Sequence, residues 1–289
     1  MKTTSDTGGL PAGAPSDLPR YESYSSLSTF EGCPARYGFR YVERLPGIVT
    51  PSQYAFGKAI HAAFEAFVRA RIAARDSWLP GPDAATIASA FGIAIDGSGC
   101  TADEIARYRE RAGPVLARFL EAEEASDGEP IGVELGFGVD VDLPGDGGRS
   151  RFVGYIDRID RRPDGGVEVL DYKTGSPRSQ ADVDADLQLT AYAFALVRGG
   201  VRDPATGAAL PAPARVGLYF ADPGITVWTR RSADQVAAFG ERLTAAVRRI
   251  RLRDFPARPA EGRCRWGEYR TTGLASAAPA ASAATRGGS

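Results

Sequence analysis

The sequence has few of the residue types that build disulfide frameworks, lysine-rich surfaces or membrane spans. Its 289 residues include three cysteines, three lysines and one histidine, His61. Three cysteines exclude a disulfide-rich secreted scaffold, and no apolar run approaches the ~20 residues that a membrane helix needs. The N-terminal segment also lacks the apolar core of a signal peptide. These absences favour a soluble, cytoplasmic protein.

The overall charge is close to neutral. Lys and Arg number 35 against 36 Asp and Glu, which gives a net charge of −1 and a pI near 6.0. This balance excludes a polybasic coat for nucleic acid, so affinity for a polyanion has to come from a local patch or a metal ion. Hydrophobic residues make up 43% and charged residues 25% of the chain, a globular composition that excludes wholesale disorder.

Apolar spacing predicts a single ordered domain over residues 21–273, between tails at 1–20 and 274–289 that are rich in Ala, Gly, Ser and Pro and are expected to be disordered. Three- and four-residue spacing predicts helices within 28–79 and over 101–125, 181–197 and 232–252. Thr101 and Glu104 form a capping box for the second of these. Alternating apolar residues predict strands over 131–141 and 152–159, and three further short strands are predicted over 167–172, 215–220 and 226–230. The first three strands are expected to form an antiparallel meander, within an α/β (α+β) domain that has a central mixed sheet flanked by helices.

Acidic residues on two neighbouring predicted strands carry the sharpest chemical signal. Asp157 lies on the second strand of the meander, while Asp171 and Lys173 lie two apart on the third and leave the same face. Two adjacent carboxylates repel each other unless a proton or a cation lies between them, and a hard cation such as Mg²⁺ suits their oxygens. The alternative is structural, with Asp157 in a salt-bridge ladder and Asp171 at a strand end.

The use of lysine favours the chemical interpretation. The chain takes nearly all its positive charge from arginine but keeps Lys173 beside these acids. A compact ammonium can orient a water molecule better than a guanidinium can. Other polar residues are ambiguous when taken alone: His61 also suits a partly buried helix position, and Gln188 with Tyr192 also suits an exposed helix pair.

Taken together and in order, four motifs resemble the PD-(D/E)XK nuclease superfamily, and more narrowly its RecB-like nuclease domains, including the CRISPR-associated type. The motifs are Gly-X-X-X-His ending at His61, Gly-X-X-Asp ending at Asp157, Asp-Tyr-Lys-Thr-Gly beginning at Asp171, and Gln-X-X-X-Tyr from Gln188 to Tyr192. The match extends from about residue 24 to residue 269. It implies a restriction-endonuclease-like core with an N-terminal helical extension.

The resemblance also implies a metal site and a reaction. The implied ligands of Mg²⁺ or Mn²⁺ are His61, Asp157, Asp171, the backbone carbonyl of Tyr172 and, with less support, Glu134. Lys173 would position the attacking water or stabilise developing charge, and Gln188 and Tyr192 would support the catalytic site and contact the DNA. The implied activity is hydrolysis of DNA phosphodiester bonds, directed at single strands or free ends, in repair, recombination or CRISPR-type defence.

A basic, aromatic helix adds a candidate DNA surface. Arg36, Tyr37 and Arg40 combine guanidinium groups with a ring, which suits phosphates and stacked bases. The chain has no P-loop motif, so a helicase would be a separate partner.

The cysteines depart from the family pattern. Many RecB-like domains bind an iron–sulfur cluster through four cysteines, and here only Cys33 and Cys264 have counterparts, while Gly267 and Gly273 stand at the other two positions. Two thiolates do not hold such a cluster, so none is expected. This loss keeps open a second interpretation, a non-catalytic DNA-binding or scaffold subunit on a nuclease fold.

Overall fold

The computed structural model describes residues 18–45, 52–77, 79–145 and 148–256. The chain divides into two compact units. The terminal unit consists of Met1–Ile48 with Ala246–Ser289, and the sheet unit consists of Val49–Ala245. Nearly all of the tail predicted at 1–20 and all of that at 274–289 lie outside the described residues, and a single domain over 21–273 stays a prediction.

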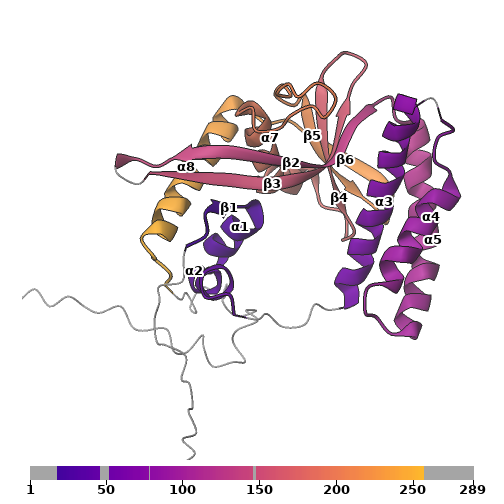
Figure 1. The fold of residues 1–289 in the computed structure, drawn as a ribbon, viewed down its shortest axis with the longest axis horizontal. Coiled ribbons are helices and arrows are strands. Elements are labelled where there is room, and N and C mark those ends of the chain that lie inside the picture. The colour runs from indigo at the N-terminus through magenta and orange to yellow at the C-terminus, as the bar shows by residue number, and fades with distance from the viewer. Residues whose placement is uncertain (1–17, 46–51, 78, 146–147, 257–289) are drawn as a thin grey trace, which may run out of the picture. The chain divides into compact units, whose positions relative to one another are not determined.

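The sheet unit is built on a mixed sheet, and its described strands are β2 (Glu129–Asp142), β3 (Arg149–Arg161), β4 (Val167–Lys173), β5 (Arg215–Phe220) and β6 (Ile225–Thr229). β2, β3 and β4 pair antiparallel in chain order, β4 and β5 are parallel, and β5 and β6 are antiparallel. The predicted meander and mixed sheet are therefore confirmed. Figure 1 shows β2 and β3 as a long hairpin that extends beyond the other strands.

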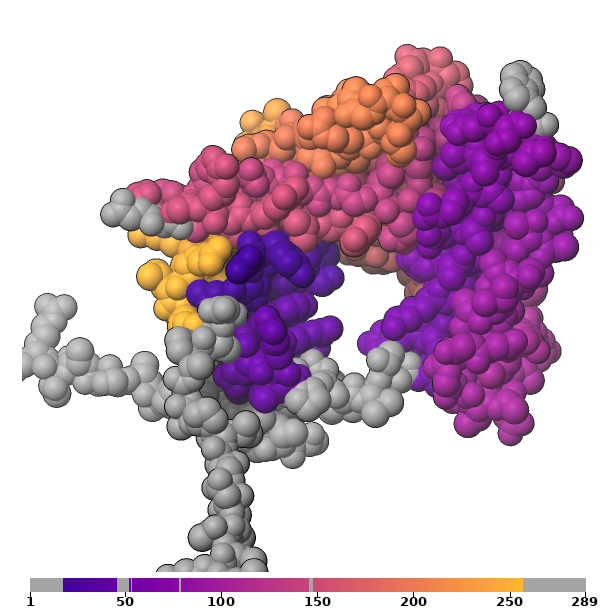
Figure 2. Space-filling view, in the orientation of Figure 1, coloured from indigo at the N-terminus to yellow at the C-terminus, as the bar shows by residue number. Residues whose placement is uncertain are grey.

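Three helices, α3 (Ser52–Ser77), α4 (Ala84–Asp96) and α5 (Ala102–Ala125), pack side by side against one end of this sheet (Figures 1 and 2). Phe64 of α3 stacks on Phe119 of α5 with ring centroids 3.8 Å apart, and both rings contact Tyr172 of β4. The capping box of α5 is present as predicted. The sequence analysis missed α4, although Ile87, Phe91 and Ile95 recur every four residues and are buried.

The helix predicted over 181–197 is divided into α6 (Gln180–Asp184) and α7 (Leu187–Val197). Asp186 divides it, because its side chain accepts a 2.9 Å hydrogen bond from the Leu189 N–H and so caps α7. α7 packs on α8 (Ala233–Arg251) through Phe194 and Phe239, and both rings contact Phe152 of β3. α8 continues into the terminal unit from residue 246 onward. No described helix combines the length and apolarity that crossing a membrane requires.

The terminal unit contains the predicted N-terminal helical extension, with β1 (Tyr21–Glu22), α1 (Tyr24–Gly32), α2 (Pro34–Tyr37) and the π-helix η1 (Gly38–Val42). The buried carboxylate of Glu22 accepts hydrogen bonds from the hydroxyls of Ser26 at 2.6 Å and Tyr37 at 2.7 Å. Phe30 and Phe255 pack on the Tyr37 ring at centroid distances of 5.5 and 5.6 Å. These contacts tie α1 and α2 to the segment that follows α8.

Candidate active site

The acidic residues lie where β3 and β4 separate. The backbone pairing of these strands runs from Arg161–Val167 to Arg158–Leu170. Two residues farther along β4, the Tyr172 N–H donates to Asp157 Oδ2 at 2.9 Å. Because every buried backbone N–H needs an acceptor, this carboxylate replaces a strand carbonyl, and the bond orients Asp157 at the point of separation.

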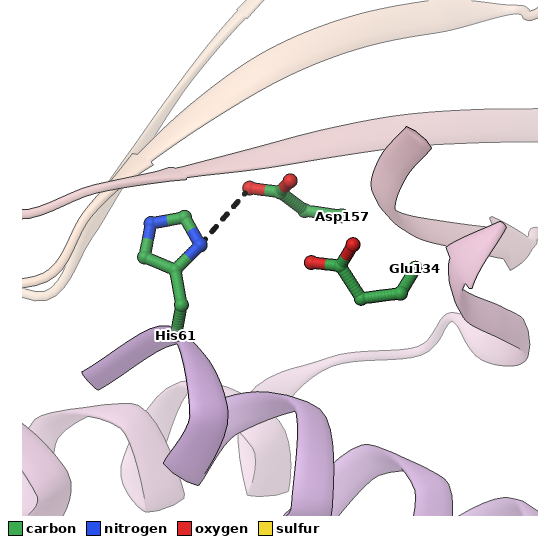
Figure 3. Close-up of side chains that lie close together, drawn as sticks. All are labelled: His61, Glu134 and Asp157. Atoms are coloured by element: carbon green, nitrogen blue, oxygen red, sulfur yellow. Dashed lines mark ion pairs between the residues drawn. The ribbon is translucent and has the colours of Figure 1, made fainter. Parts of the chain in front are cut away.

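His61 of α3, Glu134 of β2 and Asp157 of β3 converge in space, with the two carboxylates turned toward the imidazole (Figure 3). One ligand atom from each residue lies within 4.8 Å of the others, and His61 Nδ1 is 3.5 Å from Asp157 Oδ2. Glu134 has a φ of 48°, in the left-handed region that costs an L-residue about 1–2 kcal/mol. Such local strain persists mainly where the fold needs a particular side-chain direction, and functional sites are the common case.

Burial and repulsion between carboxylates shift the pKa values of the residues in this cluster. Burial, followed by repulsion from Asp171, raises the pKa of Asp157 to about 8. Burial also raises the pKa of Glu134 and lowers the pKa of His61. A hydrogen bond to the Tyr172 backbone acts in the opposite direction on the His61 pKa.

Asp171 belongs to a closed ring of polar contacts with Lys173, Gln188 and Tyr192. The Tyr192 hydroxyl donates to Asp171 Oδ1 at 2.9 Å, and Gln188 Nε2 donates to the Tyr192 hydroxyl at 2.8 Å. Lys173 Nζ donates to Gln188 Oε1 at 2.9 Å and lies 2.6 Å from Asp171 Oδ2, which closes the ring. Asp171 is 1% exposed and Tyr192 is 4% exposed. The ring therefore fixes both the carboxylate and the ammonium.

The donor atoms fit a hard divalent cation. Two carboxylates and an imidazole offer ligand atoms that lie within 4.8 Å of one another, and Mg²⁺ or Mn²⁺ accepts such ligands. The buried Asp171 Oδ2 forms an ion pair with the Lys173 ammonium at 2.6 Å, but the angles of this contact are not those of a hydrogen bond. This oxygen therefore has no hydrogen-bond donor. Glu134, the least supported acid in the sequence analysis, lies in the geometric cluster, whereas Asp171 lies beside that cluster, in the ring. The left-handed φ of Glu134 corresponds to no local pattern in the sequence.

Comparison with known proteins decides the family. A family model described as the PD-(D/E)XK nuclease superfamily matches residues 22–272. The chain belongs to the PD-(D/E)XK nuclease superfamily. The mixed sheet with its flanking helices is accordingly a restriction-endonuclease-like α/β core.

Solved structures also match this PD-(D/E)XK chain. One solved structure, titled "Crystal structure of SSO0001", is 13% identical and has a TM-score of 0.35, with 76% of this chain and 94% of that chain covered. No curated protein gives a significant sequence match. The RecB-like subtype stays a prediction.

Two of the residues predicted to contact DNA are unsuited to that role in this PD-(D/E)XK protein. Tyr37 is 0% exposed and its hydroxyl is bound to Glu22, so the ring has no free face for a base. Tyr192 is also buried, with its hydroxyl committed to Asp171. The prediction of direct contact with DNA is therefore corrected for both residues, because core packing and hydrogen bonding bury their side chains.

The other predicted contacts stay open. Arg40 is exposed and lies 5.5 Å from the centre of the Tyr41 ring, while Arg36 and Gln188 are half-buried. DNA binding by these three residues stays a prediction. Cys33 is buried in the terminal unit, whereas Cys264, Gly267 and Gly273 lie outside the described residues, so the predicted absence of an iron–sulfur cluster also stays a prediction.

Proposed function

We propose that this chain is a divalent-metal-dependent deoxyribonuclease that hydrolyses phosphodiester bonds in single-stranded DNA or at DNA ends. The observation that carries the proposal is the convergence of His61, Glu134 and Asp157 beside the ring that holds Asp171 and Lys173. Mg²⁺ or Mn²⁺ bound there would lower the pKa of a water molecule and neutralise charge on the scissile phosphate. Membership of the PD-(D/E)XK superfamily supports nuclease chemistry.

Different side chains would bind the metal ion and orient the reactants. His61, Asp157, Asp171 and the Tyr172 carbonyl would hold the metal ion, with Glu134 as a further acid. Lys173 would hydrogen-bond the attacking water or a phosphate oxygen. Its ammonium is already aimed by Gln188 and Asp171, so little reorganisation is needed when the substrate binds. Holding the reactants in line with the leaving oxygen accounts for much of the rate of phosphodiester hydrolysis.

The proposed setting is DNA repair or recombination in the cytoplasm, or CRISPR-type defence. A helicase motor, if one is required, would lie outside these 289 residues, which contain no P-loop motif. The superfamily match supports nucleic acid as the substrate, and the choice between these settings depends on the partner that purifies with the chain.

A cleavage assay on the full chain tests the proposal. A labelled single strand incubated with Mn²⁺ should be cut, EDTA should stop the reaction, and Asp171→Ala should abolish it while DNA binding persists. Asp96→Ala, an exposed acid on α4, is the matched control and should cleave at the wild-type rate. Undiminished cleavage by Asp171→Ala would refute the proposed site.

A non-catalytic DNA-binding or scaffold subunit is the second candidate, favoured by Gly267 and Gly273 at positions where the resemblance places cysteines. It requires DNA binding without turnover and no calorimetric heat on titration with Mn²⁺. Wild-type cleavage that depends on Mn²⁺ excludes it.

A further inference from the structure

The β2–β3 hairpin presents an exposed strip that leads away from the acid cluster. Side chains at two-residue intervals share one side of a strand, so Tyr155 and Arg151 lie on the side of β3 that carries Asp157. Tyr155 is 66% exposed, and Arg151 is also exposed. Between them Phe152 points to the other side, where it is buried against Phe194 and Phe239. The strip is therefore the solvent side of the hairpin, which Figure 1 shows extending from the sheet.

Glycines of β2 form the floor beneath these two side chains. Gly136 pairs with Tyr155 across the strands, and Gly138 lies two pairs farther along, opposite Val153. A Cβ at Gly136 would lie 3.4 Å from Tyr155 Cε1, and a Cβ at Gly138 would lie 2.5 Å from Arg151 Nη2. The tyrosine ring and the guanidinium therefore lie over the bare backbone of Gly136 and Gly138, with Asp140 opposite Arg151 across the strands.

Arg151 carries the uncompensated positive charge of the strip. Within the described part of the chain it has no ion-pair partner. Arg149, two residues away on the same side of β3, is instead paired with Asp142 at 3.1 Å and Asp140 at 3.6 Å. One arginine is thus available to a phosphate and its neighbour is neutralised.

The spacing matches an extended nucleic-acid strand. Tyr155 lies two residues from Asp157, about 6.6 Å along β3, a step of roughly one nucleotide. Proteins that bind single strands combine aromatic platforms for the bases with positive charge along the backbone. A duplex does not offer its base faces to such a platform, because they are stacked and paired inside the helix.

We propose that Tyr155 stacks on the base next to the scissile phosphate and that Arg151 binds a phosphate farther along, so that the Tyr155–Arg151 strip is the path of an unpaired DNA strand. That the bound strand is DNA rests on the proposed deoxyribonuclease function. Tyr155 occupies a variable position of the Gly-X-X-Asp motif and Arg151 lies outside the four motifs, so the sequence marks both only as outward positions of an alternating strand.

Fluorescence anisotropy of a labelled single strand tests the path. The full chain is titrated in Ca²⁺, and the DNA is checked on a gel to be intact. Tyr155→Ala should weaken affinity by about tenfold, and Tyr155→Phe, which keeps the ring, should bind like the wild type. A 2-aminopurine placed at the stacking position should be quenched by the wild type and by Tyr155→Phe but not by Tyr155→Ala. Affinity for a blunt duplex should change little in either variant.

Substitutions of Arg151 and Arg149 are a matched pair that tests the electrostatic contribution to DNA binding. Arg151→Ala should weaken binding and lower the slope of log affinity against log salt by about one. Arg149→Ala, on the same side of the same strand, should leave both nearly unchanged because that charge is already neutralised. Circular dichroism and melting temperature confirm that each exposed substitution folds.

The outcomes separate this proposal from the nuclease assignment. Single-strand binding within twofold of wild type in Tyr155→Ala, an equal loss in Tyr155→Phe, or no single-strand binding by the wild type overturns the strand path. If substitution of Tyr155 and Arg151 does not change cleavage with Mn²⁺, the nuclease function stands and the proposed strand path is wrong. Binding and quenching that depend on Tyr155, without any cleavage by the wild type, leave the path and remove the nuclease function.

Discussion

The hydroxyl of Tyr192 on α7 donates a 2.9 Å hydrogen bond to Asp171 Oδ1 on β4. The same hydroxyl accepts from the Gln188 side-chain amide, whose oxygen accepts from Lys173. One phenol thus joins the crossover helix to the strand that carries the acid and the ammonium. This contact makes the Gln-X-X-X-Tyr motif a support for the catalytic groups.

Tyr192→Phe removes that support and keeps the ring. A buried carboxylate oxygen then loses its donor and the Gln188 amide loses its acceptor, so we expect the free energy of unfolding to fall by about 1–3 kcal/mol. Cleavage with Mn²⁺ should fall at least about tenfold, because Asp171 and Lys173 are less well oriented. Urea denaturation and initial cleavage rates measure the two effects. Tyr108→Phe, whose hydroxyl lies a long 3.5 Å from Ser52 Oγ, is the control and should change neither.

Lys173→Arg preserves the charge but not its shape. A planar guanidinium does not fit the space where a compact ammonium contacts Gln188 and Asp171. We expect the cleavage rate to fall by about 100-fold or more, with DNA affinity nearly unchanged. Lys58→Arg, at an exposed position of α3, should cleave normally. Wild-type rates in Lys173→Arg would mean that only charge matters at this position.

Removing metal should make stability depend on pH through Asp157. Burial raises its pKa in the folded protein to about 8, against about 4 in an unfolded chain. The folded state therefore keeps a proton that the unfolded state releases, so the free energy of unfolding falls as pH rises from about 4 to about 8. Saturating Mn²⁺ replaces the proton and should flatten this fall. Urea titrations across that range, with Asp157→Asn as the variant that lacks the dependence, check the sign.

Gly154 makes room for an aromatic ring across the hairpin. A Cβ at this position would lie 2.6 Å from Phe137 Cζ, and Phe137 is buried against Phe152. Gly154→Ala should therefore destabilise the protein by about 1–3 kcal/mol through overpacking. Gly92→Ala, inside α4 where a Cβ would meet nothing within 4 Å, should stabilise it by about 0.5–1 kcal/mol. Thermal melts of the two variants should move in opposite directions.

Arg158 holds the charge network behind the catalytic strand. It is 1% exposed, its Nε donates to both Asp160 oxygens at 2.7 and 2.9 Å, and it pairs with Glu123 of α5. Arg158→Met would leave buried Asp160 without its cation and Glu123 with Arg71 as its remaining partner, at a cost of about 3–5 kcal/mol. Arg109→Ala, which breaks an exposed pair with Asp96, should cost less than about 1 kcal/mol. Chemical denaturation compares the two.

Features that depend on neighbours along the chain were predictable from the sequence. The capping box at Thr101 and the apolar alternation in β2 and β3 are local, and the structure confirms both. The ordered motifs also identify the superfamily. Local patterns fail where an interruption is subtle, as at Asp186, or where a helix such as α4 lies in a short segment between two longer ones.

Only the tertiary structure decided what each polar group faces. The burial of Tyr37, the bond from Tyr192 to Asp171 and the entry of Glu134 into the acid cluster all depend on residues distant in sequence. The open side of Tyr155 likewise depends on a glycine of the neighbouring strand. Residue type and period determine helix, strand and candidate chemistry, because those are set by the backbone and its nearest neighbours. Exposure and partners are set by packing between segments, which no local pattern contains.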